Sequence, residues 1–531
     1  MRTTIHWNLL RHLRGCYSKL AATAQTVATI LLVAVVMTAC SSKPKEVPAT
    51  FTEVADSATI YPDYREVTIP PNIAPLNFIV KDSEADAFVA EIGTMVCGAD
   101  TDGKMDIDTT AWRQLLNQNR GGDLSVNIYA HRSNGWVRHP AFTIHVAKEE
   151  IDCYLSYRLI EPGYELYRQI GLYQRNLTNF DVATIYENNR SFEGGENHCV
   201  NCHNYQNYDT RRMLFHVRAA HGGTIVTNDT EAHKIAIRHD SILAAGVYPS
   251  WHPTRPWVAF STNKTGQVFH LLYPEKIEVL DTESDLILYD AERNEVQNIL
   301  RTSDHLETFP CWTPDGKRLY YCSARLPEIE TDNLEIGLSE HFDSLLYDLY
   351  SMPFDPETRV FGQPRLEIEA SAQGMSCSVP RISPDGRFLL FTLGKYGQFH
   401  IWHKSADLWV LPLSDSSNEG VGEGLRPAYP LTAANSPDAD SYHTWSSNGR
   451  WIVFSSRRDD GNFTRPYIAY FDADGRAHRA FLLPQHDPEQ NLLLLKSYNV
   501  PELTRSAIRI PFEELKHVVL NTEAEVATFK E

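Results

Sequence analysis

The residues of this chain with the most specific chemistry are two cysteines and a histidine in one short motif. Cys199, Cys202 and His203 stand in the pattern C-x-x-C-H, which is the attachment pattern of c-type haem. Two thiols at this spacing can each bond one vinyl group of a porphyrin, and the next imidazole can bind the iron from one face. The motif therefore predicts one covalent haem c, with His203 as an iron ligand, and electron transfer as its use.

The motif is also compatible with three simpler roles for its cysteines. They could form a local disulfide, supply half of a zinc site, or be two unrelated buried thiols. A four-ligand zinc site normally has a second Cys or His pair at fixed spacing, and no second C-x-x-C follows in the sequence. The segment 193–198 does not have the strand-then-helix pattern that precedes a thioredoxin-like motif.

Three residues that follow the motif are candidates for the sixth iron ligand. They are Met213, His216 and His221. Met213 and His216 are separated by an odd number of residues in one predicted strand, so strand alternation places them on opposite faces. A methionine ligand would raise the redox potential relative to a second histidine, whereas an open sixth position would allow small-ligand binding or peroxidase-like chemistry.

The N-terminus predicts export. Residues 1–39 contain four basic residues, no acidic residue and an apolar run at 29–37, and they end in small residues before Cys40. This is the pattern of a bacterial lipoprotein signal, in which Cys40 becomes the lipidated first residue; an uncleaved anchor helix is the alternative. Ser41 fits sorting to the outer membrane. We therefore expect a cell-envelope lipoprotein that is held to the membrane by lipid on Cys40 and faces the periplasm.

The net charge of the chain limits the classes of partner that it can bind. The formal net charge is −19, whereas proteins that bind nucleic acid carry basic patches. Binding to an anionic membrane surface by charge is disfavoured for the same reason. A protein partner, either a redox partner or a scaffold partner, remains compatible with this composition.

The whole chain is too long to form one ordinary core. A repeat organises its second half. Segments 248–261, 309–323, 379–392 and 442–455 each combine a core residue, a tight turn and an apolar run, and a fainter copy spans 204–218. Glycine supplies the positive φ that the turn needs, and the apolar runs have the composition of buried strands. Repeated small sheets of this kind build a β-propeller, and the copies predict five or six blades.

The repeat resembles the TolB-like propeller repeats, also called PD40 or WD40-like repeats, over about residues 245–485. The whole chain is similar to a group of Bacteroidetes-type lipoproteins that join an N-terminal β domain, one C-x-x-C-H and a TolB-like propeller. Segments 173–180, 221–224 and 495–502 carry this likeness together with the motif. The resemblance implies a haem or haem-assembly context and assigns no functional residue beyond the motif.

The predicted fold class is mainly β, with an N-terminal β-rich, sandwich-like domain before the TolB-like β-propeller. The expected segments are 1–39 signal peptide, 40–50 tether, 51–195 N-terminal domain with a connector, 196–203 haem motif, 204–500 propeller and 501–531 C-terminal tail. Residues 110–116 predict a short helix that Thr109 or Thr110 caps. A cross-strand disulfide between Cys311 and Cys322 is open, because a tight turn joins their segments.

Two functions follow from these features. The first is a membrane-anchored, periplasm-facing propeller with one covalent c-type haem, which transfers electrons or has a haem-linked accessory role. The second is a haem-independent binding module in the cell envelope for a protein, peptide or glycan. The sequence has no G-x-S-x-G, H-E-x-x-H or phosphate-loop motif, so an enzyme is less supported, and peroxidase-like haem chemistry is the form of it that stays open.

Overall fold

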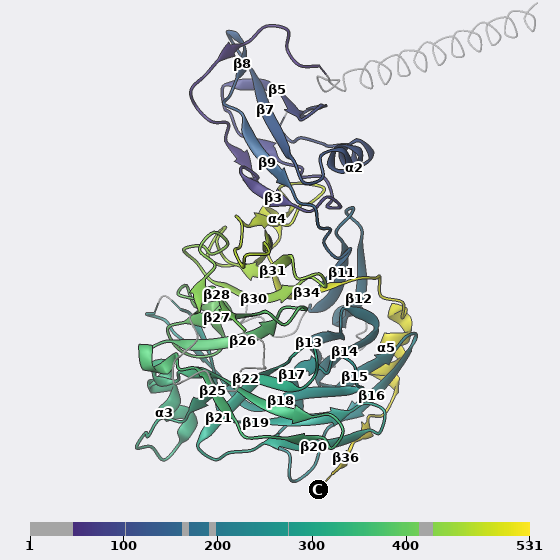
Figure 1. Ribbon diagram of the computed structural model, residues 1–531, viewed down its shortest axis with the longest axis vertical. Helices are drawn as coiled ribbons and strands as arrows, with labels where there is room; N and C mark the ends of the chain where they lie inside the picture. The colour runs from purple at the N-terminus through teal and green to yellow at the C-terminus, as the bar shows by residue number, and fades with distance from the viewer. Residues whose placement is uncertain are drawn as a thin grey trace, which may run out of the picture.

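The computed structural model describes residues 46–100, 102–161, 169–190, 198–273, 275–413 and 428–530. The predicted signal peptide and the lipidation residue Cys40 lie outside these ranges. Among the described residues, no helix has the length and apolar character needed to cross a bilayer. Strands dominate, and Figure 1 shows a smaller N-terminal unit above a ring of β-sheets.

The N-terminal unit is built on one seven-stranded sheet with the order β1-β8-β7-β5-β6, in which β9 also pairs with β7 and β3. Its strands are β1 (Thr52–Glu53), β3 (Val67–Ile69), β5 (Ala85–Ile92), β6 (Met95–Gly98), β7 (Asp123–Arg132), β8 (Gly135–Arg138) and β9 (Phe142–Val146). A separate pair, β2 (Ile60–Tyr61) and β4 (Ile79–Val80), lies beside it. The region is β-rich as expected, but it has one large sheet and a short pair instead of two packed sheets.

Helix α2 (Thr109–Gln118) belongs to this N-terminal unit and buries Trp112, Leu115 and Leu116. Its N-cap is Asp108, whose carboxylate accepts a hydrogen bond from the backbone N–H of Ala111 at 2.8 Å. The expected caps, Thr109 and Thr110, are instead the first two residues of the helix. Aspartate serves as the cap because its carboxylate reaches an amide of the first turn that has no partner within the helix.

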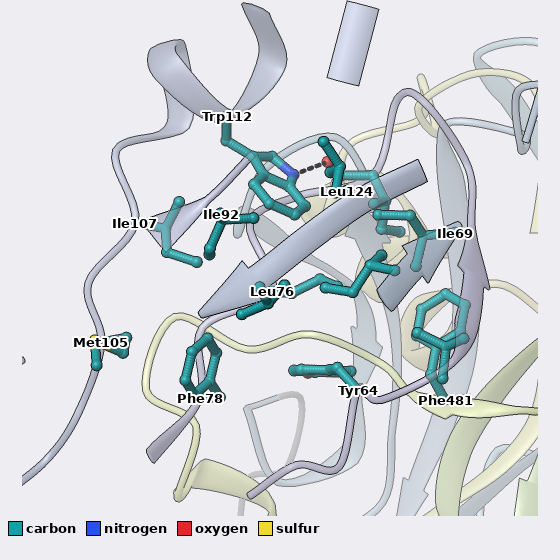
Figure 2. Close-up of a cluster of buried hydrophobic side chains, with 14 of the residues drawn as sticks. Tyr64, Ile69, Leu76, Phe78, Ile92, Met105, Ile107, Trp112, Leu124 and Phe481 are labelled. Carbon is teal, nitrogen blue, oxygen red and sulfur yellow. Dashed lines mark hydrogen bonds between the residues drawn. The ribbon is translucent and has the colours of Figure 1, made fainter. Parts of the chain in front are cut away.

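The core of the N-terminal unit continues into the ring. Figure 2 shows Trp112 donating from its indole nitrogen to the carbonyl of Ile73, a contact of 3.1 Å. In the same cluster, Tyr64 packs edge-on against Phe481 of the ring, with ring centroids 6.5 Å apart. Because one apolar cluster spans both parts, the N-terminal unit is fixed to the ring by its own core.

The ring is a β-propeller made of five hydrogen-bonded sheets. One sheet contains β10 (Tyr154–Ile160), β11 (Gly171–Asn176), β12 (Val182–Glu187) and β34 (Ser497–Thr504). The next contains β13 (His198–Gln206), β14 (Asp209–Ala219), β15 (Gly223–Asn228), β16 (Glu231–Ala236) and β35 (Glu525–Val526). Two further sheets contain β26 (Ser376–Ile382), β27 (Phe388–Gly394), β28 (Asp407–Pro412) and β29 (Tyr429–Pro430), and β30 (Asp440–Trp445), β31 (Trp451–Ser456), β32 (Arg465–Tyr470) and β33 (Phe481–Leu482).

The fifth sheet has ten strands. They are β17 (Gly246–Trp251), β18 (Trp257–Phe269), β19 (Ile277–Asp290), β20 (Glu295–Leu300), β21 (His305–Trp312), β22 (Arg318–Arg325), β23 (Tyr347–Asp355), β24 (Val360–Phe361), β25 (Arg365–Ile368) and β36 (Thr528–Phe529). Two repeats share this sheet because Ser284 of β19 pairs with Leu306 of β21. Hydrogen bonding therefore gives four separate blades and one double sheet, and the predicted count of five or six separate blades is wrong.

The first strand of each repeat lies at the centre of the ring. These strands are β13, β17, β21, β26, β30 and β34; each contacts the next, and β34 contacts β13. The contacts thus form a closed circle of first strands around one axis. The connections between strands contain α3 (Leu334–Glu340), α4 (Gln490–Leu493) and the 3-10 turns η1 (Asn188–Arg190), η2 (Phe342–Ser344), η3 (Ser371–Gln373) and η4 (His400–Trp402).

Strands from distant parts of the chain close the ring. Strand β34 pairs antiparallel with β10, from Tyr154 opposite Thr504 to Ile160 opposite Ser497. The blade therefore takes three strands from the region expected as N-terminal domain and connector, and its inner strand from the end of the chain. The expected boundaries at residues 204 and 500 do not coincide with the limits of the ring.

The segment after β34 also belongs to the ring. Helix α5 (Phe512–Asn521) buries Leu515, Val518 and Val519 in a cluster with the blade of β13. Strands β35 and β36 add parallel edges to β16 and β20. The expected C-terminal tail is thus folded onto the ring. We call α5, β35 and β36 together the clasp.

The closing strand predicts how the chain responds to truncation. A chain that ends at residue 496 lacks β34, so β10 is left with an unpaired edge and no first strand beside it. We expect this variant to lose its cooperative thermal transition. A control that ends at residue 522 loses only β35 and β36, and we expect its Tm to fall by about 2–4 °C for each 1 kcal/mol lost. Circular dichroism on heating measures both, and a native-like transition in the shorter chain would contradict the closure by β34.

Candidate functional site

The C-x-x-C-H motif lies within β13, the first strand of its blade. Cys199, Cys202 and His203 are buried, with exposed fractions of 5%, 9% and 3%. Cys199 packs in an apolar cluster with Leu172, Ile185 and other side chains. Cys202 and His203 instead line a small cavity at the axis of the ring. The two thiols therefore face different surroundings.

The motif coincides with a bulge that recurs in every first strand. The register of β13 against β14 shifts between Asn201 and Asn204, so two residues leave the regular pairing. The same shift occurs in β17, β21, β26 and β30, and in the pairing of β34 with β10. The six looped-out pairs are Cys202–His203, Tyr248–Pro249, Phe309–Pro310, Val379–Pro380, Tyr442–His443 and Val500–Pro501.

The first residue of every pair has a left-handed backbone. The φ angles lie between 46° at Tyr442 and 53° at Phe309, and Cys202 has 51°. For residues other than glycine this conformation costs about 1–2 kcal/mol. All six positions carry a side chain, so the fold holds six strained residues around its axis, and Cys202 is one of them.

Proline is the most frequent second residue of these pairs. Four of the six are proline, and the remaining two are His203 and His443. Proline cannot donate to a strand ladder and is accepted at bulges. The backbone at His203 is therefore a repeat feature, and what distinguishes this position is its side chain.

The imidazole of His203 is held neutral. Burial, with a smaller effect of the nearby Arg158 charge, lowers the pKa of His203 to about 3. The backbone of Ser156 and Val500 is close enough to oppose this shift, but neither ring nitrogen makes a hydrogen bond of normal geometry within the described chain. His203 is thus a buried imidazole with two unsatisfied nitrogens.

Arg158 of β10 reaches the same cavity from the neighbouring blade. Its guanidinium donates to the side-chain oxygens of Asn201 and of Asn499, the latter at 3.0 Å. Asn201 and Asn499 are the residues that precede the bulge pairs of β13 and β34. Arg158 therefore joins the inner strands β13 and β34 at the point where the ring closes.

The cavity beside the motif is too small for a porphyrin. Its volume is about 60 Å³, and its wall includes Cys202, His203 and Arg158, whereas pockets for ligands of that size occupy about 300–1,000 Å³. The thiols also lack a common cavity. In this arrangement the residues do not fit a haem, so haem attachment at Cys199 and Cys202 stays a prediction from the sequence.

The three candidate sixth ligands do not meet His203. None of them lines its cavity. Met213 is fully buried in an apolar cluster, and the Nδ1 of His216 lies 3.0 Å from the hydroxyl of Thr224. His221 lies in the turn after β14 with its ring 5.8 Å from that of His198.

Free thiols are found at Cys153, Cys199, Cys202, Cys311, Cys322 and Cys377. They include Cys311 and Cys322, which the sequence left open as a cross-strand disulfide. Cys311 lies opposite Tyr320, and Cys322 lies opposite Thr308. The two thiols are therefore offset along the strand pair and do not face each other.

Metal binding has no arranged site in the described part of the chain. No group of three or more His, Cys, Asp or Glu side chains there is placed to hold a metal ion. The zinc interpretation of the motif would need such a group. The structure instead concentrates polar side chains elsewhere on the axis.

A larger cavity, the axial funnel, opens at the end of the first strands where the repeat turns leave them. Its volume is about 320 Å³. One residue from each first strand, directly after the bulge pair, lines it. These six residues are Asn204, Ser250, Cys311, Arg381, Thr444 and Glu502. Arg381 and Pro249 also line the cavity of His203, so the two spaces share part of their wall.

Arg381 and Glu502 are the charged types among these six residues. Glu502 accepts hydrogen bonds from the side chain of Asn204 at 2.8 Å and the backbone N–H of Tyr205 at 3.2 Å. Burial raises the pKa of Glu502 to about 8, although Arg381 lowers it. The side chain of Glu502 is half-buried and lines the funnel. At neutral pH, below its pKa, this carboxyl is therefore mainly protonated.

Arg381 of the funnel wall has no ion pair. Its guanidinium donates to the carbonyl of Pro380 at 3.1 Å. No carboxylate of the described chain forms an ion pair with Arg381 at 4 Å or less, although Glu502 shares its cavity. The charge of Arg381 is therefore not neutralised by a direct carboxylate contact within the described residues.

Sequence reasoning misses Arg158, Arg381 and Glu502. A signal for two of them was present, because residues 379–382 and 500–503 share a valine, a proline, a charged residue and an aliphatic residue. Aligning these segments reveals a sixth first strand and places Arg381 and Glu502 at the same repeat position. Arg158 has no such signal, because its role depends on the closure of the ring.

Comparison with known proteins adds no family. No family model matches this chain, and no curated relative matches it. Solved structures with similar folds include an oligogalacturonate lyase in complex with manganese, with 12% identity over 62% of this chain and 74% of that chain and a TM-score of 0.33. A luciferin-regenerating enzyme has 9% identity over 61% and 90% of the two chains, with a TM-score of 0.33.

The β-propeller domain of a trilobed protease from Pyrococcus furiosus is also similar. It has 10% identity over 75% of this chain and 98% of that chain, with a TM-score of 0.29. At these values the similarity gives no information about a ligand or a reaction. The resemblance to TolB-like lipoproteins therefore stays a prediction.

The bulge predicts that β13 accepts a proline at position 203. His203→Pro places in β13 the residue that four equivalent positions already have, so we expect the free energy of unfolding to stay the same or rise. Val200→Pro, three residues earlier in a paired and fully buried position, removes a ladder hydrogen bond and should cost about 3 kcal/mol or more. Urea unfolding of the two variants measures this difference, and equal destabilisation by both would contradict the bulge assignment.

The size of the cavity predicts the outcome of a haem assay. After expression with a cytochrome c maturation system, we expect no c-haem band in the pyridine haemochrome spectrum and an intact mass without haem. A reduced α band with one haem of added mass, both lost in Cys199→Ser, Cys202→Ser, would overturn this expectation and support the haem prediction.

Proposed function

We propose that this protein is a binding module that holds a carboxylate-bearing ligand in its axial funnel. The observation that carries the proposal is the position of Arg381 in the wall of the funnel, together with a carboxyl, Glu502, whose pKa burial raises to about 8. A guanidinium without an ion-paired carboxylate can take a ligand carboxylate in a two-point hydrogen bond. The volume of about 320 Å³ is suited to one small ligand or one end of a longer one.

Two donors support an anionic ligand. Arg381 supplies charge, and protonated Glu502 can donate from its carboxyl. Other residues that line the funnel, such as Ser250 and Thr444, add hydroxyl groups.

The cell envelope is the location that we propose for this module. The support is the basic, apolar and small-residue pattern of residues 1–39 before Cys40. Lipid on Cys40 would hold the protein to the outer membrane with the ring facing the periplasm. A protein partner, as a scaffold or redox partner, remains part of this proposal, and nucleic acid is not.

Electron transfer through a haem at Cys199, Cys202 and His203 is the second candidate. One observation favours it, namely the two unsatisfied ring nitrogens of His203, since an iron ligand needs a free nitrogen. The cavity of about 60 Å³ disfavours it. A peroxidase-like reaction would depend on the same haem.

Arg381→Met tests the proposed site, because it keeps much of the length of the side chain and removes its charge. The probes are a hexuronate, N-acetylated amino acids and succinate, followed by tryptophan fluorescence, since Trp312 and Trp445 lie in the funnel wall. We expect at least one probe to bind and Arg381→Met to weaken it about ten-fold or more. The control is Arg387→Met, on an exposed arginine of the same repeat outside the funnel.

The pH dependence of binding gives a second readout of the same site. Above pH 8 the carboxyl of Glu502 ionises and repels a ligand carboxylate, so the affinity should fall as the pH rises through 8. Glu502→Gln should remove this fall. No binding by any probe, or equal effects of Arg381→Met and Arg387→Met, would contradict the proposal.

A further inference from the structure

A second cavity, the basic groove, lies beside the axial funnel on the blade of β13. Its volume is about 450 Å³. Four arginines line it, two from β14 and two from the segment after β34. They are Arg211, Arg212, Arg505 and Arg509. This cluster of guanidinium groups stands out in a chain with a formal net charge of −19.

The carboxylates of the groove do not neutralise it. Arg211 binds Asp209 at 2.5 Å, and Arg509 binds Asp229 at 2.8 Å. Arg212 has only a 3.5 Å contact with Glu292, which is outside the groove. Arg505 alone of the four has no ion pair at 4 Å or less within the described residues, and the groove keeps a net positive charge because its wall has four arginines and two aspartates.

Arg505 is fixed in place without an ion pair. Its guanidinium donates to the backbone carbonyl of Asn207 at 2.6 Å, and its backbone N–H donates to the carbonyl of Tyr208 at 3.1 Å. The turn after β13 thus orients the charge of Arg505. A positioned guanidinium can bind a carboxylate with less loss of side-chain entropy than a free one.

The chemistry of the ligand follows from the rest of the wall. Beside the arginines and aspartates, the wall contains Gln206, Asn207 and Asn228, and Pro253 is its one residue without a polar side chain. Amides and carboxylates exchange hydrogen bonds with hydroxyl groups, whereas apolar peptide side chains would find no apolar wall here. The groove therefore suits a ligand that is hydroxylated along its length and negatively charged.

The basic groove and the axial funnel are neighbours, since Asn207 and Pro253 line both. We propose that the basic groove is a second subsite for an acidic oligosaccharide, a chain of uronic acids whose end occupies the axial funnel. This inference rests on the proposed function, because the funnel supplies the first carboxylate contact. The groove then binds the carboxylates and hydroxyls of the following sugar units.

Calorimetry with two probes tests the subsite: a single hexuronate and a tetramer of the same hexuronate. The groove variant is Arg212→Gln, Arg505→Gln, and the funnel variant is Arg381→Met. We expect the native chain to bind the tetramer about ten-fold or more tightly than the monomer, because each additional charge-assisted contact strengthens binding by about that factor. The groove variant should bind the tetramer no better than the monomer, and the monomer as the native chain does.

Controls separate the possible failures. Arg325→Gln, on an exposed arginine at the far end of β22, should change neither affinity, and a carboxyl-reduced tetramer should not bind. Unchanged tetramer affinity in the groove variant would overturn the subsite while leaving the funnel intact. Loss of monomer binding in Arg381→Met supports the funnel in that case. Binding of tetraglutamate in place of both sugars would overturn the ligand class, and no binding of any of these probes by the native chain would overturn both proposals.

Discussion

The ring depends on the antiparallel pairing of β34 with β10. These strands come from opposite ends of the ring-forming chain, and they pair from Tyr154 opposite Thr504 to Ile160 opposite Ser497. Without this pairing, the circle of first strands would be open between β30 and β13. Arg158 strengthens the same junction because its guanidinium joins Asn201 and Asn499. The clasp of α5, β35 and β36 then covers the outer edges of the neighbouring blades.

A second constraint acts inside each first strand. The bulge turns one residue to a positive φ, which is 51° at Cys202, and the next residue leaves the ladder. The fold accepts proline at the second position, and it holds Cys202, Tyr248 or valine at the first at some cost in strain. A five-residue motif that predicts haem chemistry thus occupies a backbone that the repeat already determines. The chemistry of Cys202 and His203 therefore depends on their side chains and cavity, because the unusual backbone is common to all six repeats.

Much of the ring could be predicted from the sequence, because tight turns and apolar runs recur at regular spacing. Trp251, Trp312 and Trp445 are buried as expected of core residues, and the structure places each at the end of a first strand. The closure could not be predicted, since β10 carries no repeat signature and pairs with a strand at the other end of the chain. The double sheet depends on a single bridge between Ser284 and Leu306, a detail of sheet twist that local composition does not encode. For the candidate site, Arg381 and Glu502 were visible only as differences between copies of one repeat.

Those differences explain why a binding site can arise on a repeated scaffold. Six equivalent positions face the funnel, and a symmetrical ring of small polar residues would hold only water. One arginine and one glutamate at two of these positions break that symmetry, so the two sides of the funnel differ in chemistry. Burial raises the pKa of the Glu502 carboxyl, which therefore takes up a proton, and this leaves Arg381 as the charged member of the two. The turn after β13 lines both the funnel and the basic groove. Its Asn207 carbonyl accepts a hydrogen bond from the guanidinium of Arg505, which places a positive charge next to the funnel. A ligand aligned by the funnel would therefore leave it toward positive charge.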